Sequence, residues 1–530
     1  MERSSSFAQP HDYGTQRAFE SLKSIRGKRV TVMGLGLHGG GLASARFFLK
    51  HGAFVTVTDM KSAEELESSV KALTEDSDLD SSRLHFVLGT HNIEDFKNAD
   101  AVIKNPGVKY TGNPYLAAAR CIETDMSIFL QFNRAPLIAV TGSKGKSSTV
   151  SAVHYGLNKA GIHSLLGGNI TVSPLSFLDQ TDEKALKSCG NLPVVVLELS
   201  SWQLADLRGR RLLKPYITLI SEIVPDHQNW YGSMENYVAD KKLIYADQGP
   251  NDYTVCLDGQ WGDVFASESR ARVLRCPSGL PELLQSSWLD KLAVPGDHMK
   301  KNIQSAAAIM HLMGLKDDVT VSVLQSYTGI PHRLEAFFRT EKQGITCTVY
   351  NDSASTVPES CAAALQAFDK PVYLIAGGTD KDCDFKPLAD ALIQAQCSGR
   401  LAALFLLAGS ATDKLTTLLN GQNGQSGQAE KSAQPEQSGA FSAIGVQGSG
   451  GAVAAQGSGK KIAVPYFGPY DSLDEALIAV KKTVFAAGKT VARAADVAVV
   501  FSPGAASFGM FKNEFERGNR FKETVCRLFA

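Results

Sequence analysis

Short apolar runs rich in β-branched residues alternate with stretches of helical periodicity through most of the 530-residue chain. Most of these runs end in a glycine or a polar turn. This alternation is typical of βαβ units, in which crossover helices join parallel strands. We therefore predict an α/β fold built on mainly parallel sheets.

The apolar runs fall into three blocks, and a chain of this length is expected to hold about three domains, at roughly 100 to 200 residues each. We place the domains at 28–134, 135–331 and 332–530, after a leader of residues 1–27. The strands expected in chain order are RVTVMG and FVTVTD in the first block, PLIAVTG, VVVLELS and ITLISEI in the second, and TCTVYND, PVYLIAGG, AALFLLAG, KIAVPYFG and VAVVFSPG in the third.

Residues 421–459 differ from the rest of the third block, because they consist mostly of Gly, Ser, Gln and Ala and contain QGSG twice. Such a segment buries too little apolar surface to offset the entropy lost on ordering. We predict a flexible surface insertion between two strands.

The composition favours small molecules as the substrates. The formal net charge is zero and 44% of the residues are apolar, which argues against a surface for nucleic acid. Nine cysteines occur without a C-x-x-C pair, so neither a disulfide framework nor a zinc ribbon is indicated. The first residues lack the apolar core of a signal peptide, and the longest apolar run, 401–407, is too short to span a membrane. We expect a cytoplasmic protein.

A glycine-rich turn follows the first predicted strand. Gly34, Gly36 and Gly39 have G-x-G-x-x-G spacing, and Asp59 closes the next strand. This spacing lets the backbone approach a diphosphate at a helix N-terminus, while Asp59 can accept a hydrogen bond from a ribose hydroxyl. The pattern predicts a nucleotide that carries a diphosphate. A tight turn without ligand and a nicotinamide-dependent oxidoreductase are the alternatives at this point.

A shortened phosphate loop, T-G-S-K-G-K-S-S, follows the first strand of the second block. The first glycine of the full G-x-x-x-x-G-K-[ST] loop is replaced by Val140. The remaining glycines can still expose amides, Lys146 can reach a transferred phosphate, and the Ser147 hydroxyl can bind Mg²⁺. We predict ATP binding by Gly142, Ser143, Lys144, Gly145, Lys146, Ser147 and Ser148.

Two neighbouring strand ends in the second block carry candidate metal ligands. Glu198 ends VVVLE, while Asp226 and His227 follow ITLISEIVP. Nucleotides and their metals bind beyond the carboxyl edge of parallel sheets, so these side chains are expected near the phosphate loop. A capping role for the glutamate and a structural histidine are the alternatives.

Further motifs give the chain a family resemblance. LELSSWQL, PDH followed by YVADKKLIY, GDHMKKN, IPHRLE, NDSAST, GGTDKDCDF and SPGAASFGMFKNEFERG, together with the phosphate loop, resemble the Mur ligases of peptidoglycan synthesis. The resemblance runs from about Lys28 to the C-terminus outside the insertion, and is strongest to the D-glutamate-adding members. It implies a UDP-binding Rossmann-like domain, a central ATPase domain and a C-terminal Rossmann-like domain for the amino acid.

The implied activity is a peptide-bond-forming ligation. D-glutamate would be added to UDP-N-acetylmuramoyl-L-alanine through an acyl phosphate, using ATP and two Mg²⁺ sites in cytoplasmic peptidoglycan precursor synthesis. By resemblance, one metal site uses Ser147 and Glu198, and the other uses His227 with a carbamylated Lys241. Carbamylation has a physical reason, since an ammonium would repel Mg²⁺ whereas a carbamate offers it anionic oxygens. An unmodified surface lysine is the alternative.

The resemblance also assigns the binding residues. Those for the UDP substrate are Leu37, His38, Asp59 and Asn169; further contacts to ATP come from Asn302, Arg333 and Asp352; and those for D-glutamate are Thr356, Lys381, Ser507 and Phe508. Lys146, His227 and Lys241 would be catalytic. Because the ATP contacts come from the second and third domains, closure of these domains would assemble the site.

Four positions depart from the family pattern: Thr171 replaces the last glycine of G-N-I-G, Met299 an asparagine, Ala354 a lysine and Glu514 an aromatic residue. The competing functions are a sibling ligase for another amino acid, a folylpolyglutamate synthase, and a nucleotide-binding regulator without activity. The small hydroxyl residues of NDSAST favour the D-glutamate enzyme over its siblings. We expect a monomer.

Overall fold

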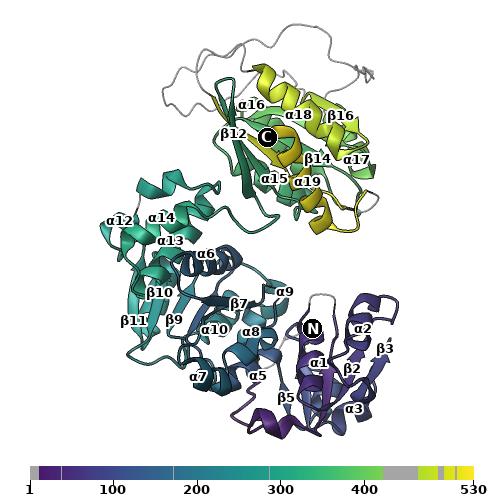
Figure 1. The fold of residues 1–530 in the computed structure, drawn as a ribbon, viewed down its shortest axis with the longest axis vertical. Helices are drawn as coiled ribbons and strands as arrows, with labels where there is room; N and C mark the ends of the chain where they lie inside the picture. The colour runs from purple at the N-terminus through teal and green to yellow at the C-terminus, as the bar shows by residue number, and fades with distance from the viewer. Residues whose placement is uncertain are drawn as a thin grey trace, which may run out of the picture. The chain divides into compact units, whose positions relative to one another are not determined.

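The structure is a computed structural model that describes residues 11–36, 39–170, 172–285, 287–421, 464–487, 495–507 and 510–530. Its strands form three sheets, so the predicted α/β class is confirmed (Figure 1). The predicted site residues Leu37, His38 and Phe508, and nearly all of the 421–459 insertion, lie outside the described residues.

The chain forms two compact units. The first comprises the residues up to Ala293 together with Asp297–Tyr327, and the second comprises Val294–Gly296 and Thr328–Ala530. The first unit contains two of the three sheets, which we call the first and the central subdomain. Each unit is described separately below.

The first subdomain has a five-stranded parallel sheet of order β3-β2-β1-β4-β5. Its strands β3 to β5 are short or partly exposed and carry a weaker apolar pattern than the two predicted strands. The strands are β1 (Arg29–Met33), β2 (Phe54–Asp59), β3 (Leu84–Leu88), β4 (Ala101–Lys104) and β5 (Ile122–Glu123), and the helices are η1 (Leu22–Ile25), α1 (Gly40–Lys50), α2 (Glu67–Thr74), η2 (Ser81–Arg83), α3 (Ile93–Lys97), α4 (Pro114–Ala118) and α5 (Asp125–Phe132).

The central subdomain has a six-stranded parallel sheet of order β11-β10-β9-β6-β8-β7. The strands are β6 (Leu137–Thr141), β7 (Ser164–Gly168), β8 (Val194–Glu198), β9 (Ile217–Ile220), β10 (Tyr253–Leu257) and β11 (Arg272–Cys276). The helices are α6 (Lys146–Lys159), η3 (Pro174–Gln180), α7 (Glu183–Cys189), α8 (Ser201–Ala205), α9 (Gln228–Tyr231), α10 (Met234–Lys242), α11 (Gln260–Glu268), α12 (Glu282–Gln285), η4 (Ser287–Lys291), α13 (Asp297–Leu312) and α14 (Asp317–Gln325).

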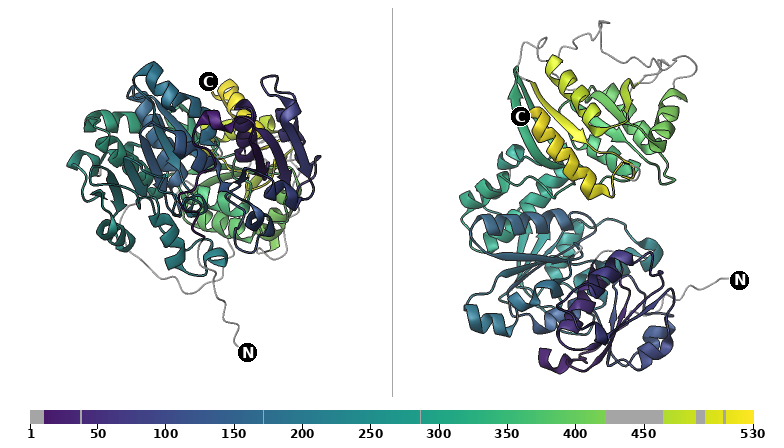
Figure 2. Two further views of the ribbon diagram at one scale, coloured as in Figure 1. Left: turned by 90° about the horizontal axis from the view of Figure 1, so that it is seen from below. Right: turned by 45° about the vertical axis from the view of Figure 1, so that its right-hand side comes forward.

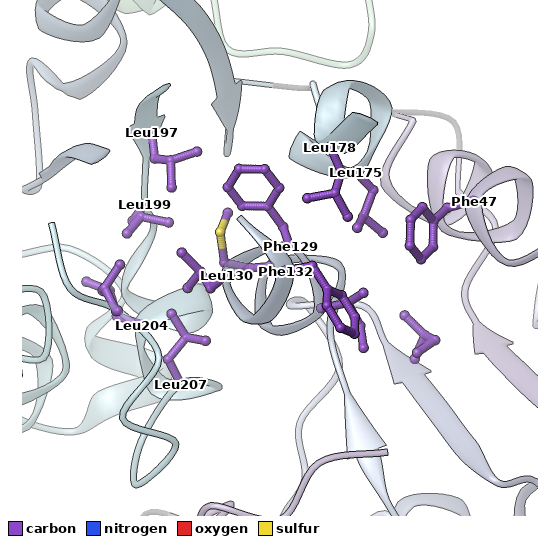
Figure 3. Close-up of a cluster of buried hydrophobic side chains, with 14 of the residues drawn as sticks. Phe47, Phe129, Leu130, Phe132, Leu175, Leu178, Leu197, Leu199, Leu204 and Leu207 are labelled. Atoms are coloured by element: carbon purple, nitrogen blue, oxygen red, sulfur yellow. The ribbon is translucent and has the colours of Figure 1, made fainter. Parts of the chain in front are cut away.

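Helix α5 joins the cores of these two subdomains. Its Phe129 and Phe132 belong to a buried cluster that also includes Phe47 of α1 and Leu197 of β8 (Figure 3). Apolar burial is the main favourable term in folding, so a core shared in this way couples the two sheets mechanically.

The second unit has a six-stranded sheet of order β12-β13-β17-β14-β15-β16, in which only β12 is antiparallel to its neighbour. Helices α18 and α19 pack on one face of it, and α15, α16 and α17 contact β14 and β15 (Figure 2). The elements are β12 (Glu335–Lys342), β13 (Ile345–Asn351), α15 (Pro358–Gln366), β14 (Val372–Gly377), α16 (Lys386–Cys397), β15 (Leu401–Leu407), α17 (Ser410–Gly421), β16 (Tyr466–Tyr470), α18 (Leu473–Ala487), β17 (Ala495–Phe501) and α19 (Glu514–Phe529).

All five strands predicted for this block are present, although β16 starts later than the predicted KIAVPYFG run. In the described part of the chain, none of the helices combines the length and the apolar character needed to cross a lipid bilayer.

Candidate active site

The phosphate loop connects β6 to α6 and depends on two glycines with positive φ. Gly142 has φ +147°, and a Cβ there would lie 2.0 Å from Ser221 Oγ. Gly145 has φ +87° and is the N-cap of α6; a Cβ there would lie 2.2 Å from Asn302 Oδ1. Only glycine fits both the conformation and the space. The loop therefore lies against Asn302 of α13, a residue that the family resemblance assigns to ATP binding.

The loop is held by bonds to the end of β9. The amides of Ser143 and Lys144 both donate to the carbonyl of Glu222, at 2.8 and 3.3 Å. The Ser143 hydroxyl accepts a hydrogen bond from Tyr237 OH at 3.1 Å and donates to Val224 O at 2.9 Å. Glu222 and Val224, which follow β9, and Tyr237 of α10 thus fix the shape of the loop.

Lys146 is the first residue of α6 and folds back over the loop. Its ammonium donates to the carbonyls of Gly142 and Ser143, at 2.9 and 3.1 Å. Burial lowers the pKa of Lys146, while the nearby carboxylates of Glu198 and Asp226 act in the opposite direction. The positions of these charges show that the loop, β8 and the segment after β9 meet at one site.

Lys241 of α10 contacts the same loop. Its side chain is buried, at 1% exposure, and its ammonium donates to the Gly142 carbonyl at 2.8 Å. Burial, reinforced by repulsion from Lys146, lowers the pKa of Lys241 to about 7. A substantial fraction of this amine is therefore neutral near pH 7, and the neutral amine is the nucleophilic form.

Glu198 ends β8 with an incompletely satisfied carboxylate. Its Oε1 accepts a hydrogen bond from the Asn169 side chain at 2.8 Å, whereas the buried Oε2 has no hydrogen-bond partner. An orphaned buried carboxylate oxygen is costly unless a cation or donor satisfies it. Mg²⁺ is usually bound by one or two carboxylates together with phosphate oxygens of the substrate, and Glu198 fits such a role.

His227 lies at the start of α9 in a left-handed conformation, with φ +51°. Its ring centroid is 4.9 Å from that of Trp202, and its Nε2 is 3.9 Å from Asp226 Oδ1. Within the described ranges, no three His, Cys, Asp or Glu side chains are grouped so that they could hold a metal by themselves. Metal binding at Ser147, Glu198, His227 and Lys241 would accordingly need oxygens from a ligand or from a modified lysine.

The glycine-rich turn of the first subdomain lies between β1 and α1, where Gly34 and Gly36 have φ +94° and +63°. Asp59 Oδ2 accepts hydrogen bonds from the amides of Leu35 and Gly36, at 2.9 and 3.2 Å. The carboxylate predicted to bind a ribose hydroxyl thus also holds the turn in shape. Its remaining lone pairs leave room for that second role.

Arg333 and Asp352 are neighbours in the second unit. Asp352 follows β13 and accepts hydrogen bonds from Leu334 N at 3.1 Å and from Ser502 Oγ at 2.7 Å. Burial raises the pKa of Asp352 to about 7, although Arg333 lowers it in part. This carboxyl is consequently poised between its charged and neutral forms near physiological pH.

The described residues predicted for D-glutamate come together at the carboxyl ends of neighbouring strands β13, β14 and β17. Thr356 follows β13, Lys381 follows β14, and Ser507 follows β17. The three turns are joined by backbone hydrogen bonds, because Gly504 N donates to Ser355 O and Ala506 N to Thr379 O. Ala354, where the family has lysine, donates its amide to His332 O.

Two side chains that hold the turns of these sites in place, Tyr237 and Arg517, were not identified from the sequence. Tyr237 lies one helical turn before Lys241 in α10, a spacing that could have indicated it. The buried Arg517 of α19 donates to Ser353 O and Ala505 O, at 2.8 and 3.0 Å. It therefore connects the turn after β13 to the turn after β17. Its motif, FERG, carried no separate signal for this role.

Comparison with known proteins identifies relatives of the whole chain. The Mur ligase middle domain matches residues 140–276, and the Mur ligase MurD-like N-terminal domain matches residues 28–126. UDP-N-acetylmuramoylalanine--D-glutamate ligase of Treponema pallidum (strain Nichols) is 38% identical, with 95% of this chain and 98% of that protein covered. The ligase of the same name from Borreliella burgdorferi (strain ZS7) is 34% identical, with 96% and 99% covered. The crystal structure of the UDP-N-acetylmuramate-alanine ligase MurC from Thermotoga maritima is 16% identical, with a TM-score of 0.48 and 94% and 99% covered.

Proposed function

The chain belongs to the Mur ligase family, and from this premise we propose that it joins D-glutamate to UDP-N-acetylmuramoyl-L-alanine at the expense of ATP. The observation that carries this assignment is the 38% identity to a D-glutamate ligase along nearly the full length of both chains. The activity belongs to the synthesis of peptidoglycan precursors. We further propose a monomer that acts in the cytoplasm.

The reaction has two steps. The alanyl carboxylate of the UDP substrate attacks the γ-phosphorus of ATP, which forms an acyl phosphate and releases ADP. The amine of D-glutamate then attacks the acyl carbon, and the tetrahedral intermediate collapses with loss of phosphate as the amide forms. Phosphoryl transfer of this kind depends mainly on positioning and on charge stabilisation.

Lys146 supplies positive charge in the first step. Its ammonium lies on the carbonyls of Gly142 and Ser143, and rotation of this flexible side chain would bring it to the γ-phosphate. Asn302, which lies against Gly145, would contact the nucleotide next to the loop. Arg333 and Asp352 of the second unit are proposed to complete the ATP contacts.

Two Mg²⁺ ions, one held by Ser147 and Glu198 and one by His227 and Lys241, would neutralise the phosphate charge. The unpartnered Oε2 of Glu198 supports the first site. For the second, we propose that Lys241 is carbamylated, since its buried amine has a lowered pKa and the carbamate would replace a cation with oxygen ligands. The hydrogen bond from Nζ to Gly142 would then keep the modified side chain in place.

The remaining polar contacts are assigned to the other two substrates. Asp59 and Asn169, together with Leu37 and His38, are proposed to bind the UDP substrate. Thr356, Lys381, Ser507 and Phe508 are proposed to bind D-glutamate, whose second carboxylate requires a cation and neutral donors.

The test is a phosphate-release assay with UDP-N-acetylmuramoyl-L-alanine, ATP, Mg²⁺ and one amino acid at a time. Release is expected with D-glutamate and not with L-glutamate. Lys146→Ala should lower kcat by about a thousandfold or more, the scale of a lost transition-state charge contact. Lys159→Ala, at the exposed far end of α6, should leave it unchanged. Absence of release with D-glutamate, or normal turnover by Lys146→Ala, would refute the proposal.

A further inference from the structure

We infer that Lys104 is a positioning residue for the UDP substrate, because it ties one wall of the proposed UDP site to the central subdomain. This inference rests on the proposed function, in which the glycine-rich turn holds the diphosphate of the substrate. Lys104 is the last residue of β4, and its side chain is 2% exposed. A buried ammonium is retained only where its partners compensate the loss of water.

The first partners of Lys104 are in the turn that follows β4. Its Nζ donates to Asn105 O at 3.1 Å and to Val108 O at 2.9 Å. The turn is also closed by its own hydrogen bonds, from Val108 N to Asn105 O and from Gly107 N to Asn105 Oδ1. Lys104 therefore holds both ends of the turn, at Asn105 and at Val108.

This turn lies against the glycine-rich turn that is proposed to hold the diphosphate. A Cβ on Gly34 would lie 3.4 Å from Asn105 Cβ. A small cavity of about 30 Å³ is lined on one side by Gly34 and Gly40, at the start of α1, and on the other by Asn105 and Pro106. A diphosphate at the N-terminus of α1 would accordingly touch the turn that Lys104 holds.

The third partner lies in the other subdomain. Lys104 Nζ is 2.8 Å from the buried Oδ2 of Asp206, the C-cap of α8. Asp206 Oδ1 accepts a hydrogen bond from Tyr13 OH at 3.0 Å. Helix α8 starts three residues after Glu198. The ion pair therefore links the turn after β4 to the helix that follows the strand end proposed to hold Mg²⁺.

A second buried ion pair crosses between the same subdomains and serves as the comparison; its Arg210 also donates a hydrogen bond from Nε to Asp206 O at 2.9 Å. Arg210 Nη1 is 2.9 Å from Glu123 Oε2, and both side chains are at most 2% exposed. Neither residue lines the small cavity beside the glycine-rich turn. A merely adhesive role for Lys104 would make the two pairs equivalent, whereas a positioning role would not.

The experiment compares two double variants of the full chain, Lys104→Met/Asp206→Asn and Arg210→Met/Glu123→Gln. Each removes both charges of one pair, so that no buried charge is left without its counterion. Calorimetry measures Kd for UDP, UDP-N-acetylmuramoyl-L-alanine and a non-hydrolysable ATP analogue. Phosphate release then gives KM and kcat, and thermal denaturation gives Tm.

For Lys104→Met/Asp206→Asn, we expect Kd and KM for the UDP substrate to rise about tenfold or more, the scale of a misplaced binding wall. Its Kd for the ATP analogue and its saturated kcat should stay within about twofold, since those contacts are unchanged. Both double variants should lower Tm to a similar extent. Arg210→Met/Glu123→Gln should leave the Kd for the UDP substrate unchanged.

Equal effects of the two double variants on Kd, or no effect of either, would overturn the inference. If the first double variant does not fold, Asp206→Asn alone is measured in the same way, because it keeps an acceptor for Tyr13, and an unchanged Kd would then count against Lys104. A wild-type chain that binds the ATP analogue but no UDP compound would refute the proposed function itself, and the inference with it.

Discussion

The ammonium of Lys241 donates a 2.8 Å hydrogen bond to the carbonyl of Gly142, the first glycine of the phosphate loop. A helix that follows β9 thus contributes directly to the loop that follows β6. The pairing places a buried amine of lowered pKa beside the proposed phosphate position.

Lys241→Met should strongly slow ligation while leaving the fold intact. Removal of the amine eliminates the proposed carbamate and the proposed second metal site, so we expect kcat to fall by about a hundredfold or more. The measurement is phosphate release with all three substrates. With ¹³C-bicarbonate, the wild-type chain should also show a carbamate signal in the ¹³C NMR spectrum that the variant lacks.

Lys242→Met is the control for this variant. Lys242 is the next residue of α10, and its Nζ pairs with Glu268 at 2.6 Å, away from the loop. This change should leave kcat within about twofold, as is usual for a partly exposed ion pair. Equal loss of activity in the two variants would argue against a specific role for Lys241.

Gly145→Ala should weaken ATP binding beyond what backbone strain explains. The new Cβ would lie 2.2 Å from Asn302 Oδ1 at φ +87°, so Asn302 and the loop must move apart. We expect Kd for the ATP analogue to rise about tenfold or more, as for other displaced ligand contacts.

Gly161→Ala separates strain from contact. Gly161 has φ +84° and lies just after the C-terminal end of α6, the helix that Gly145 precedes. A Cβ on Gly161 would meet nothing within 4 Å. It should cost about 1 kcal/mol of stability and leave the Kd for ATP unchanged. Calorimetry and thermal denaturation of both variants give the comparison, and similar Kd values would contradict the proposed loop–Asn302 contact.

Asp352→Asn should change how stability depends on pH. Burial raises the pKa of Asp352 to about 7 in the folded chain, whereas an unfolded aspartate titrates near 4. Between about pH 4 and pH 7 the folded state therefore retains a proton that the unfolded state releases, and this group makes stability fall as pH rises.

Asparagine cannot ionise, so the variant should avoid that loss. Relative to wild type, its free energy of unfolding should increase by about 1–3 kcal/mol between pH 5 and pH 8, as linkage predicts for a shift of this direction. Denaturant titrations without nucleotide test this, with the exposed Asp369→Asn as control. A difference between wild type and variant that does not change with pH would show that Asp352 titrates normally.

Much of the local structure follows from short-range sequence signals. The spacing T-G-S-K-G-K-S placed the phosphate loop between a strand and a helix, and β6, α6 and both positive-φ glycines are found there. The strand end at Glu198 was read from the apolar run that precedes it. These signals succeed because the apolar pattern of a strand and the tolerance of glycine for positive φ are local properties of the sequence.

Strands β3 to β5, β7 and β10 to β12 were not predicted, because much of the stability of such strands comes from pairing within the sheet and not from their own apolar pattern. The Lys104–Asp206 pair was equally hidden, since its members are far apart in the chain and neither belongs to a motif.

What the sequence determined by itself was the α/β class, the order of the motifs and, through its resemblance, the family and its reaction. What only the tertiary structure decided was which side chains meet: Lys241 with Gly142, Asn302 with Gly145, and Lys104 with the turn after its own strand and with Asp206. The physical reason is that strand and helix patterns depend on local periodicity, whereas burial of a charge depends on partners that only packing brings together.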